Sequence, residues 1–140
     1  MVQQKITHIL KESYPSDKKK RKDIIDSLRR KIATSSVDMA ITTEELYLLL
    51  DEAVTNAMEH GNAWDPRKTV DVTVTADPRI MRISIADQGK GFDTREIKAS
   101  LKSRDILSTR GRGLYIINQF CEISWNKKGN QILLDIKRKK

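Results

Sequence analysis

A carboxylate and a carboxamide share one face of a predicted helix. Glu52 and Asn56 are four residues apart, so their side chains project from the same side, one turn apart. A carboxylate can accept a proton from an attacking hydroxyl or water, and a neutral amide oxygen suits a magnesium ion whose charge is balanced mainly by phosphates. The pair therefore predicts a site that orients a nucleophile beside a metal ion, with Glu52 as general base and Asn56 as metal ligand.

A first glycine-containing segment, Asp87-Gln88-Gly89-Lys90-Gly91-Phe92, begins where a predicted strand ends. The ionised Asp87 only accepts hydrogen bonds, so the exocyclic N6 amine of adenine is a suitable donor to it. Gly89 and Gly91 lack a Cβ and let the backbone approach a flat ring closely. Taken alone, this segment is more typical of an ordinary Asp-initiated turn.

A second segment, Gly111-Arg112-Gly113, stands just before a predicted apolar helix that starts near Leu114. The free N–H groups and the positive dipole end of a helix N-terminus bind phosphates, although a flexible cap is the simpler interpretation. The polar run 93–110 is expected to close over the ligand as a lid. Further phosphate contacts are expected from Ser103, Arg104, Ser108, Thr109, Arg110 and Arg112. The three elements, in this order and at these separations, indicate a nucleotide site.

Length and composition favour one soluble, globular domain over residues 1–140. Hydrophobic residues make up 38% and charged residues 33% of the chain, which excludes a disordered protein. No apolar run approaches the roughly 20 residues that span a bilayer, and no signal-peptide core is present, so a cytoplasmic location is expected. Cys121 is alone, so no internal disulfide or thiolate metal cluster is expected, and its apolar surroundings predict a core residue.

The formal net charge is +8, and residues 18–22 and 137–140 are especially basic. Such a patch can serve nucleic acid, a membrane surface or an acidic protein, or it can simply keep a helix end and a tail soluble. Direct nucleic-acid contact is not expected, because no aromatic residues or known motif accompany the charges. With Arg29, Arg30 and Lys31, residues 18–22 form a candidate docking face for an acidic protein partner.

Hydrophobic periodicity predicts the elements that position these residues. We expect an edge strand over 5–12, then an amphipathic helix with Ser16 as N-cap and Asp17 in its first turn. A second helix is expected to begin at a Thr42 or Thr43 cap, supported by Glu44 or Glu45, and to stop at Gly61.

The remaining pattern predicts a hairpin over 70–87 and a short helix over 95–102. A further helix is expected over 114–120, and a last hairpin over 123–136. Helices inserted between hairpins predict an α+β fold, a two-layer sandwich with helices on one face of a mostly antiparallel sheet.

At these residues the chain resembles the GHKL ATPase superfamily, and in particular its small anti-sigma-factor serine kinases. Glu52-Ala53-Val54-Thr55-Asn56-Ala57, followed by His60-Gly61, is similar to their N box. Asp87-x-Gly89-x-Gly91-Phe92 is similar to the G1 box, and Gly111-Arg112-Gly113-Leu114 to the G2 box. The likeness runs from about Thr43 to Ile136.

The resemblance implies a Bergerat-type ATP-binding fold with ATP and Mg²⁺ as cofactors. It makes Glu52 the general base, Asn56 the Mg²⁺ ligand and Asp87 the adenine reader. The family often has a Gly-Thr pair in the last hairpin, where this chain has Gly129-Asn130. The nucleotide-binding set that we expect is Asn56, Asp87, Gly89, Gly91, Phe92, Arg110, Gly111, Arg112, Gly113 and Leu114.

The resulting hypothesis is a Mg-ATP-dependent serine/threonine protein kinase that acts as an anti-sigma factor or a related partner-switching regulator. The partners implied are a small anti-anti-sigma (STAS-type) protein as substrate, a sigma factor, and a second copy in a homodimer. The alternatives are an ATP-binding module without catalysis, a detached histidine-kinase-type catalytic domain and a basic nucleic-acid binder. The histidine-kinase alternative lacks a helix that offers a dimerising phosphoacceptor histidine.

Overall fold

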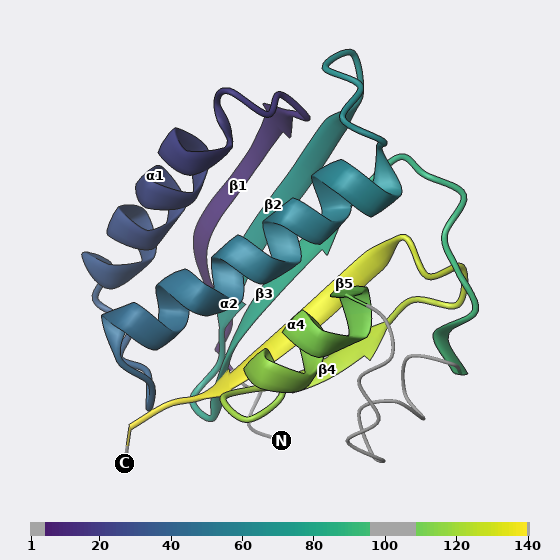
Figure 1. Ribbon diagram of the computed structural model, residues 1–140. Helices are drawn as coiled ribbons and strands as arrows, with labels where there is room; N and C mark the ends of the chain where they lie inside the picture. Colours follow the sequence, from purple (N-terminus) through teal and green to yellow (C-terminus); the bar gives the residue numbers. More distant parts are fainter. Residues whose placement is uncertain (1–4, 96–108, 140) are drawn as a thin grey trace.

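Helices and strands form two layers in the computed structural model, which describes residues 5–95 and 109–139 (Figure 1). In chain order the elements are β1 (Thr7–Pro15), α1 (Arg21–Ala33), α2 (Thr43–Asn56), η1 (Ala57–Gly61), β2 (Thr69–Ala76), β3 (Ile80–Ala86), α4 (Thr109–Ile117), β4 (Glu122–Trp125) and β5 (Gln131–Lys137). The strands make an antiparallel sheet in the order β1-β2-β3-β5-β4. Helices α1, α2 and α4 lie across one face of it, so the expected α+β sandwich is confirmed (Figure 1).

Alternating side chains of the central strands build the core beneath these helices. Val70, Val72 and Val74 of β2 are fully buried, as their alternation with polar residues predicts. They share one core with the apolar stripes of the two long helices, which are Ile24, Ile25, Leu28 and Ile32 in α1 and Leu46, Leu49, Leu50, Ala53 and Val54 in α2. Because each buried aliphatic side chain contributes about 1.5–3 kcal/mol, α2 is held firmly against the sheet.

Both predicted hairpins form, β2 with β3 and β4 with β5. β1 pairs with β2 and forms one edge of the sheet, as predicted, but it continues to Pro15. The predicted capping box also forms, with Thr42 and Glu45 as its members. The Thr42 hydroxyl accepts from the Glu45 N–H at 3.0 Å, and the Glu45 carboxylate accepts from the Thr42 N–H at 2.9 Å.

The first helix begins later than predicted, and Ser16 is not its N-cap. α1 starts at Arg21 after Lys20, which makes no side-chain capping bond, and Asp17 therefore precedes the first turn. Ser16 is instead buried, and its hydroxyl accepts a hydrogen bond from Asn62 Nδ2 at 2.8 Å. This contact between distant parts of the chain takes the hydroxyl away from the local capping role.

The α4 helix begins earlier than predicted. It spans Thr109–Ile117, so Gly111 and Gly113 lie inside the helix and do not precede it. It also ends before Phe120, whose N–H donates to the Ile117 carbonyl at 2.9 Å in the following turn. Cys121 follows that turn and is buried, and burial raises the pKa of its thiol to about 12. The expectation of an inert core cysteine is therefore supported, although it lies outside the helix.

Most of the predicted lid, and the helix predicted over 95–102, fall among residues 96–108, which lie outside the described residues. Within the described part of the chain, no helix is long and apolar enough to cross a membrane.

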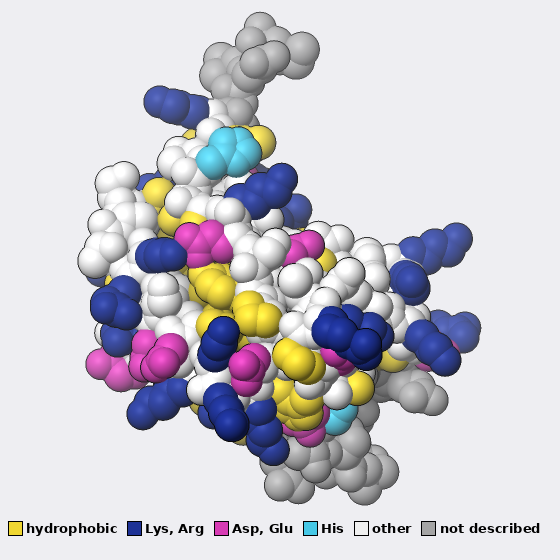
Figure 2. Space-filling view, turned by 90° about the horizontal axis from the view of Figure 1, so that it is seen from above, with side chains coloured by type: hydrophobic (Ala, Val, Ile, Leu, Met, Phe, Trp, Pro, Cys, Tyr) yellow, Lys and Arg dark blue, Asp and Glu magenta, His cyan; other side chains and the backbone are white. Residues whose placement is uncertain are grey.

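Charged side chains of both signs cover the face of the molecule shown in Figure 2. Lys and Arg side chains surround this face and alternate with acidic ones. Some basic residues are engaged in ion pairs: Arg21 binds Asp51, and Lys31 Nζ lies 2.6 Å from Glu12 Oε1. Basic and acidic side chains are interspersed on the face drawn in Figure 2.

Candidate active site

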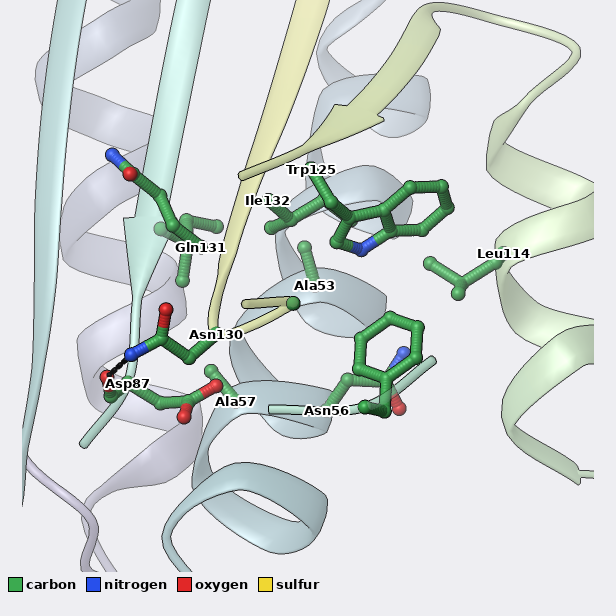
Figure 3. A pocket seen from close by; sticks show the side chains of 12 residues that line it. Ala53, Asn56, Ala57, Asp87, Leu114, Trp125, Asn130, Gln131 and Ile132 are labelled. Atoms are coloured by element: carbon green, nitrogen blue, oxygen red, sulfur yellow. Dashed lines mark hydrogen bonds between the residues drawn. The ribbon is translucent and has the colours of Figure 1, made fainter. Parts of the chain in front are cut away.

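A small cavity opens between α2, the end of the sheet and α4, and some of the predicted site residues line it (Figure 3). It brings together four of them, Asn56, Asp87, Phe92 and Leu114. The other lining residues are Ala53, Ala57, Ile85, Trp125, Gly129, Asn130, Gln131 and Ile132. The cavity encloses about 20 Å³, the space of about one water molecule. With the side chains in these positions, the cavity is too small for a group of the size of a nucleotide base.

Two aromatic rings narrow the cavity. Phe92 and Trp125 meet edge to face, with ring centroids 5.8 Å apart and an interplanar angle of 86°. Leu114, which is buried, approaches them from α4 (Figure 3). Trp125 was not among the predicted site residues. Its place at the end of an alternating strand, just before a glycine turn, is the signal that could have found it.

The Glu52 carboxylate is half-buried and lies one helical turn from Asn56, whose Nδ2 donates to Glu52 Oε1 at 3.4 Å. Burial raises the pKa of Glu52 above its usual range, and the neighbouring charges of Asp51 and Glu59 add to the rise. The hydrogen bond from Asn56 opposes the shift. A carboxylate with a raised pKa is a stronger proton acceptor, which is the property that a general base needs.

Gly113 of α4 brings the G2 segment against this carboxylate. A Cβ added at Gly113 would overlap the Glu52 carboxyl group. Glycine therefore lets α4 pack against the base with the carboxyl group in this position. The side chains of Arg110 and Arg112 lie outside the described residues, so their phosphate contacts, and that of Gly111, stay predictions.

Asp87 follows β3 and is held in place by the β4–β5 turn. Its N–H donates to the Asn130 carbonyl at 2.9 Å, and Asn130 Nδ2 donates to the Asp87 carbonyl at 3.4 Å (Figure 3). Its carboxylate Oδ1 accepts from the Gly89 N–H at 2.8 Å. Asn130, where the family often has Thr, thus lies beside the proposed adenine reader.

The glycines of the G1 segment permit close contacts within the protein, while their predicted approach to a nucleotide ring stays a prediction. A Cβ at Gly89 would overlap the Gly61 carbonyl, and a Cβ at Gly91, where φ is +80°, would overlap the Lys128 carbonyl. A Cβ at Gly129, where φ is +84°, would likewise overlap the Phe92 backbone. The close approaches that these glycines permit are therefore between protein backbones, and they lock the Asp87 loop between η1 and the β4–β5 turn.

Gly61 also has a role that the sequence did not indicate. It ends η1, as predicted, but the left-handed residues after the helix are Ala63 and Trp64, with φ 52° and 56°. A Cβ at Gly61 would overlap the Asp87 carboxyl group. Glycine lets the Asp87 carboxylate pack against the helix end in this position, and a larger residue would displace it.

The arrangement fits a nucleotide and a metal ion by the chemistry of its groups. It offers a hydrogen-bond acceptor at Asp87, an amide at Asn56 and a carboxylate at Glu52 that packs against a glycine of the neighbouring helix. Among the described residues, no cluster of three or more His, Cys, Asp or Glu side chains could hold a metal alone. A metal ion here therefore needs further ligands, such as phosphate oxygens.

Comparison with known proteins identifies the family of this chain. Residues 15–136 match the histidine kinase-like ATPase domain. The chain belongs to this family. The resemblance to GHKL ATPases, drawn from the three boxes, is thereby confirmed.

Curated relatives of this ATPase domain include regulators and sensors. The anti-sigma F factor of Shouchella clausii (strain KSM-K16) is 35% identical over 80 residues, which cover 56% of this chain and 55% of that protein. The anti-sigma F factor of Geobacillus stearothermophilus is 31% identical over 86 residues, 58% of this chain and 59% of the relative. The sensor histidine kinase YdfH of Bacillus subtilis (strain 168) is 30% identical over 96 residues, 68% of this chain and 23% of YdfH. The chain thus spans little more than half the length of the anti-sigma F factors it matches.

Proposed function

We propose that this protein is a Mg-ATP-dependent serine/threonine protein kinase that acts as an anti-sigma factor or a related partner-switching regulator. The observation that carries the proposal is the half-buried Glu52 carboxylate with its raised pKa, one turn from Asn56 and packed against Gly113. The likeness to anti-sigma F factors supports the regulatory part of the proposal.

In this proposal each residue has one task. Asp87 accepts a hydrogen bond from the adenine amine, and the Asn56 amide oxygen is offered to Mg²⁺. Glu52 takes the proton of the attacking serine or threonine hydroxyl. Bound Mg·ATP would supply the phosphoryl group and neutralise its developing charge, so the protein contributes mainly positioning and electrostatics.

Transfer of label from ATP tests this function. The purified protein is incubated with Mg·ATP labelled at the γ-phosphate and with small proteins encoded by neighbouring genes. We expect an acid-stable label on serine or threonine of one partner. An acid-labile label would instead support the histidine-kinase alternative, which the YdfH match favours. Tight ATP binding without any transfer would support a non-catalytic module.

Asn56→Ala is expected to weaken Mg·ATP binding by about tenfold and metal-free ATP binding much less, because one neutral ligand contact is lost. Calorimetry with and without Mg²⁺ measures the difference. Thr55→Ala is the matched control. Thr55 lies on another face of α2, where its hydroxyl accepts a hydrogen bond from Arg21 of α1. Equal losses with and without Mg²⁺ would argue against a metal ligand.

The basic face of α1 is the proposed docking site for an acidic partner. Reversing Arg29 and Arg30 to Glu is expected to slow association by about tenfold at low salt, and less at high salt, because screening weakens exposed charge pairs. The control, Lys11→Glu with Arg79→Glu, changes the net charge equally at exposed positions in β1 and the β2–β3 turn. If both double variants slow association alike in stopped-flow measurements, the α1 face has no specific role.

A further inference from the structure

Asn62, the residue after η1, is a fully buried polar side chain that joins distant segments. Its Nδ2 donates to Ser16 Oγ at 2.8 Å and to the Thr69 carbonyl at 2.9 Å. Its Oδ1 accepts from the Gln88 N–H at 2.8 Å. One amide thus ties the end of η1 to the residues that follow β1, to the start of β2 and to the loop after β3.

The loop that Asn62 holds is the one that carries Asp87. Gln88 is the next residue, so the bond from its N–H acts on the backbone directly beside the proposed adenine reader. Gly61, the residue before Asn62, is where the Asp87 carboxylate and Gly89 both pack against η1. The loop therefore contacts the helix end at two adjacent residues, through the side chain of Asn62 and the backbone of Gly61.

A π-helical turn connects this contact to the rest of the site. The Asn62 N–H donates to the Ala57 carbonyl at 2.9 Å, five residues back, and Trp64 N–H donates to the Met58 carbonyl at 2.8 Å. π-Helical turns are rare and occur frequently at functional sites. This one continues directly from the α2 turn that carries Asn56, so the proposed metal ligand and the Asp87 loop are joined through one continuous, hydrogen-bonded segment.

We propose that Asn62 is a positioning residue for adenine recognition: it holds the Gln88 backbone so that the Asp87 carboxylate is in place before the nucleotide arrives. The inference rests on the proposed function in one respect, that a nucleotide binds with its base beside Asp87. A preorganised acceptor avoids the cost of ordering the loop on binding. The acceptor of the Gln88 N–H belongs to Asn62, which is fully buried, and this limits competition by water at that end of the bond.

The alternative is that Asn62 only stabilises the fold, and a matched pair of variants separates the two roles. Asn62→Ala removes the acceptor for Gln88. Ser16→Ala removes one scaffold contact of Asn62 and leaves the bond to Gln88. We expect Asn62→Ala to weaken ATP binding by about tenfold, the scale of one lost buried hydrogen bond. Binding of purine riboside triphosphate, which lacks the exocyclic amine, should hardly change.

Ser16→Ala should lower the unfolding temperature and leave both nucleotide affinities as they are. In an Asp87→Ala background, Asn62→Ala should cause no further loss of ATP affinity, because two residues that act through one contact are not additive. Equal weakening of both nucleotides by Asn62→Ala, or full additivity with Asp87→Ala, would overturn the proposal.

Hydrogen exchange supplies a test that needs neither a variant nor a nucleotide. The Gln88 amide of the unliganded parent protein should exchange slowly, like the amides of the sheet. Exchange at the rate of an open loop would overturn the proposal, even if Asn62→Ala does not fold. If the parent protein does not bind ATP but its Gln88 amide is protected, the proposed function is wrong, while the conclusion that Asn62 fixes the loop is retained.

Discussion

Glu52→Gln is expected to slow phosphotransfer by about 10²–10⁴-fold while ATP affinity stays nearly unchanged. Glutamine keeps the shape and most hydrogen bonding of the side chain but cannot accept the proton of the attacking hydroxyl. Single-turnover transfer and calorimetry on the same preparation measure the two effects separately. Glu44→Gln is the control, because Glu44 is an exposed carboxylate in the first turn of the same helix.

The raised pKa of Glu52 adds two further expectations. The transfer rate of the parent should fall, as the pH is lowered, at a pH above the usual range of a glutamate, because the protonated form is no base. A raised pKa in the folded state also means that the ionised carboxylate destabilises the fold at neutral pH, and that this cost is absent below the pKa of the unfolded chain. Glu52→Gln should therefore unfold at a higher temperature than the parent at pH 7. Undiminished transfer by Glu52→Gln would place the base elsewhere.

Asp87→Ala is expected to lower ATP affinity by about 10- to 100-fold and to abolish the preference for adenine over guanine nucleotides. A hydrogen bond between a carboxylate and the exocyclic amine is charge-assisted and about twice as strong as a neutral one. Competition between ATP and GTP, followed by calorimetry, measures the selectivity.

Two variants make the Asp87 test specific. Asp87→Asn retains an acceptor oxygen and should fall between the parent and Asp87→Ala. Asp38→Ala, the control, removes an exposed carboxylate that pairs with Arg138 and lies outside the proposed site. Unfolding temperatures show whether loss of the bond to Gly89 loosens the loop. If Asp87→Ala keeps full selectivity with the fold intact, adenine is read by another group.

The sequence alone determined the elements whose signals are local. The alternating valines of β2, the apolar stripe of α2 and the capping box of Thr42 and Glu45 all act over a few residues, and all were confirmed. Glu52 and Asn56 were paired correctly for the same reason, since residues four apart must meet on a helix. The order of three short motifs was enough to indicate the family.

Only the tertiary structure decided features that depend on contacts between distant residues. Ser16 does not cap a helix, because its hydroxyl binds Asn62, 46 positions away. Asn62 in turn accepts a hydrogen bond from the N–H of Gln88, 26 positions further along the chain. Gly61 and Gly113 leave room for carboxylates of other elements, Asp87 and Glu52, which occupy the space of a Cβ. No local pattern encodes such fits, because the groups that contact these residues lie far away in the sequence. The sequence motifs thus identify the chemical groups of the site, and contacts between distant segments determine where those groups lie.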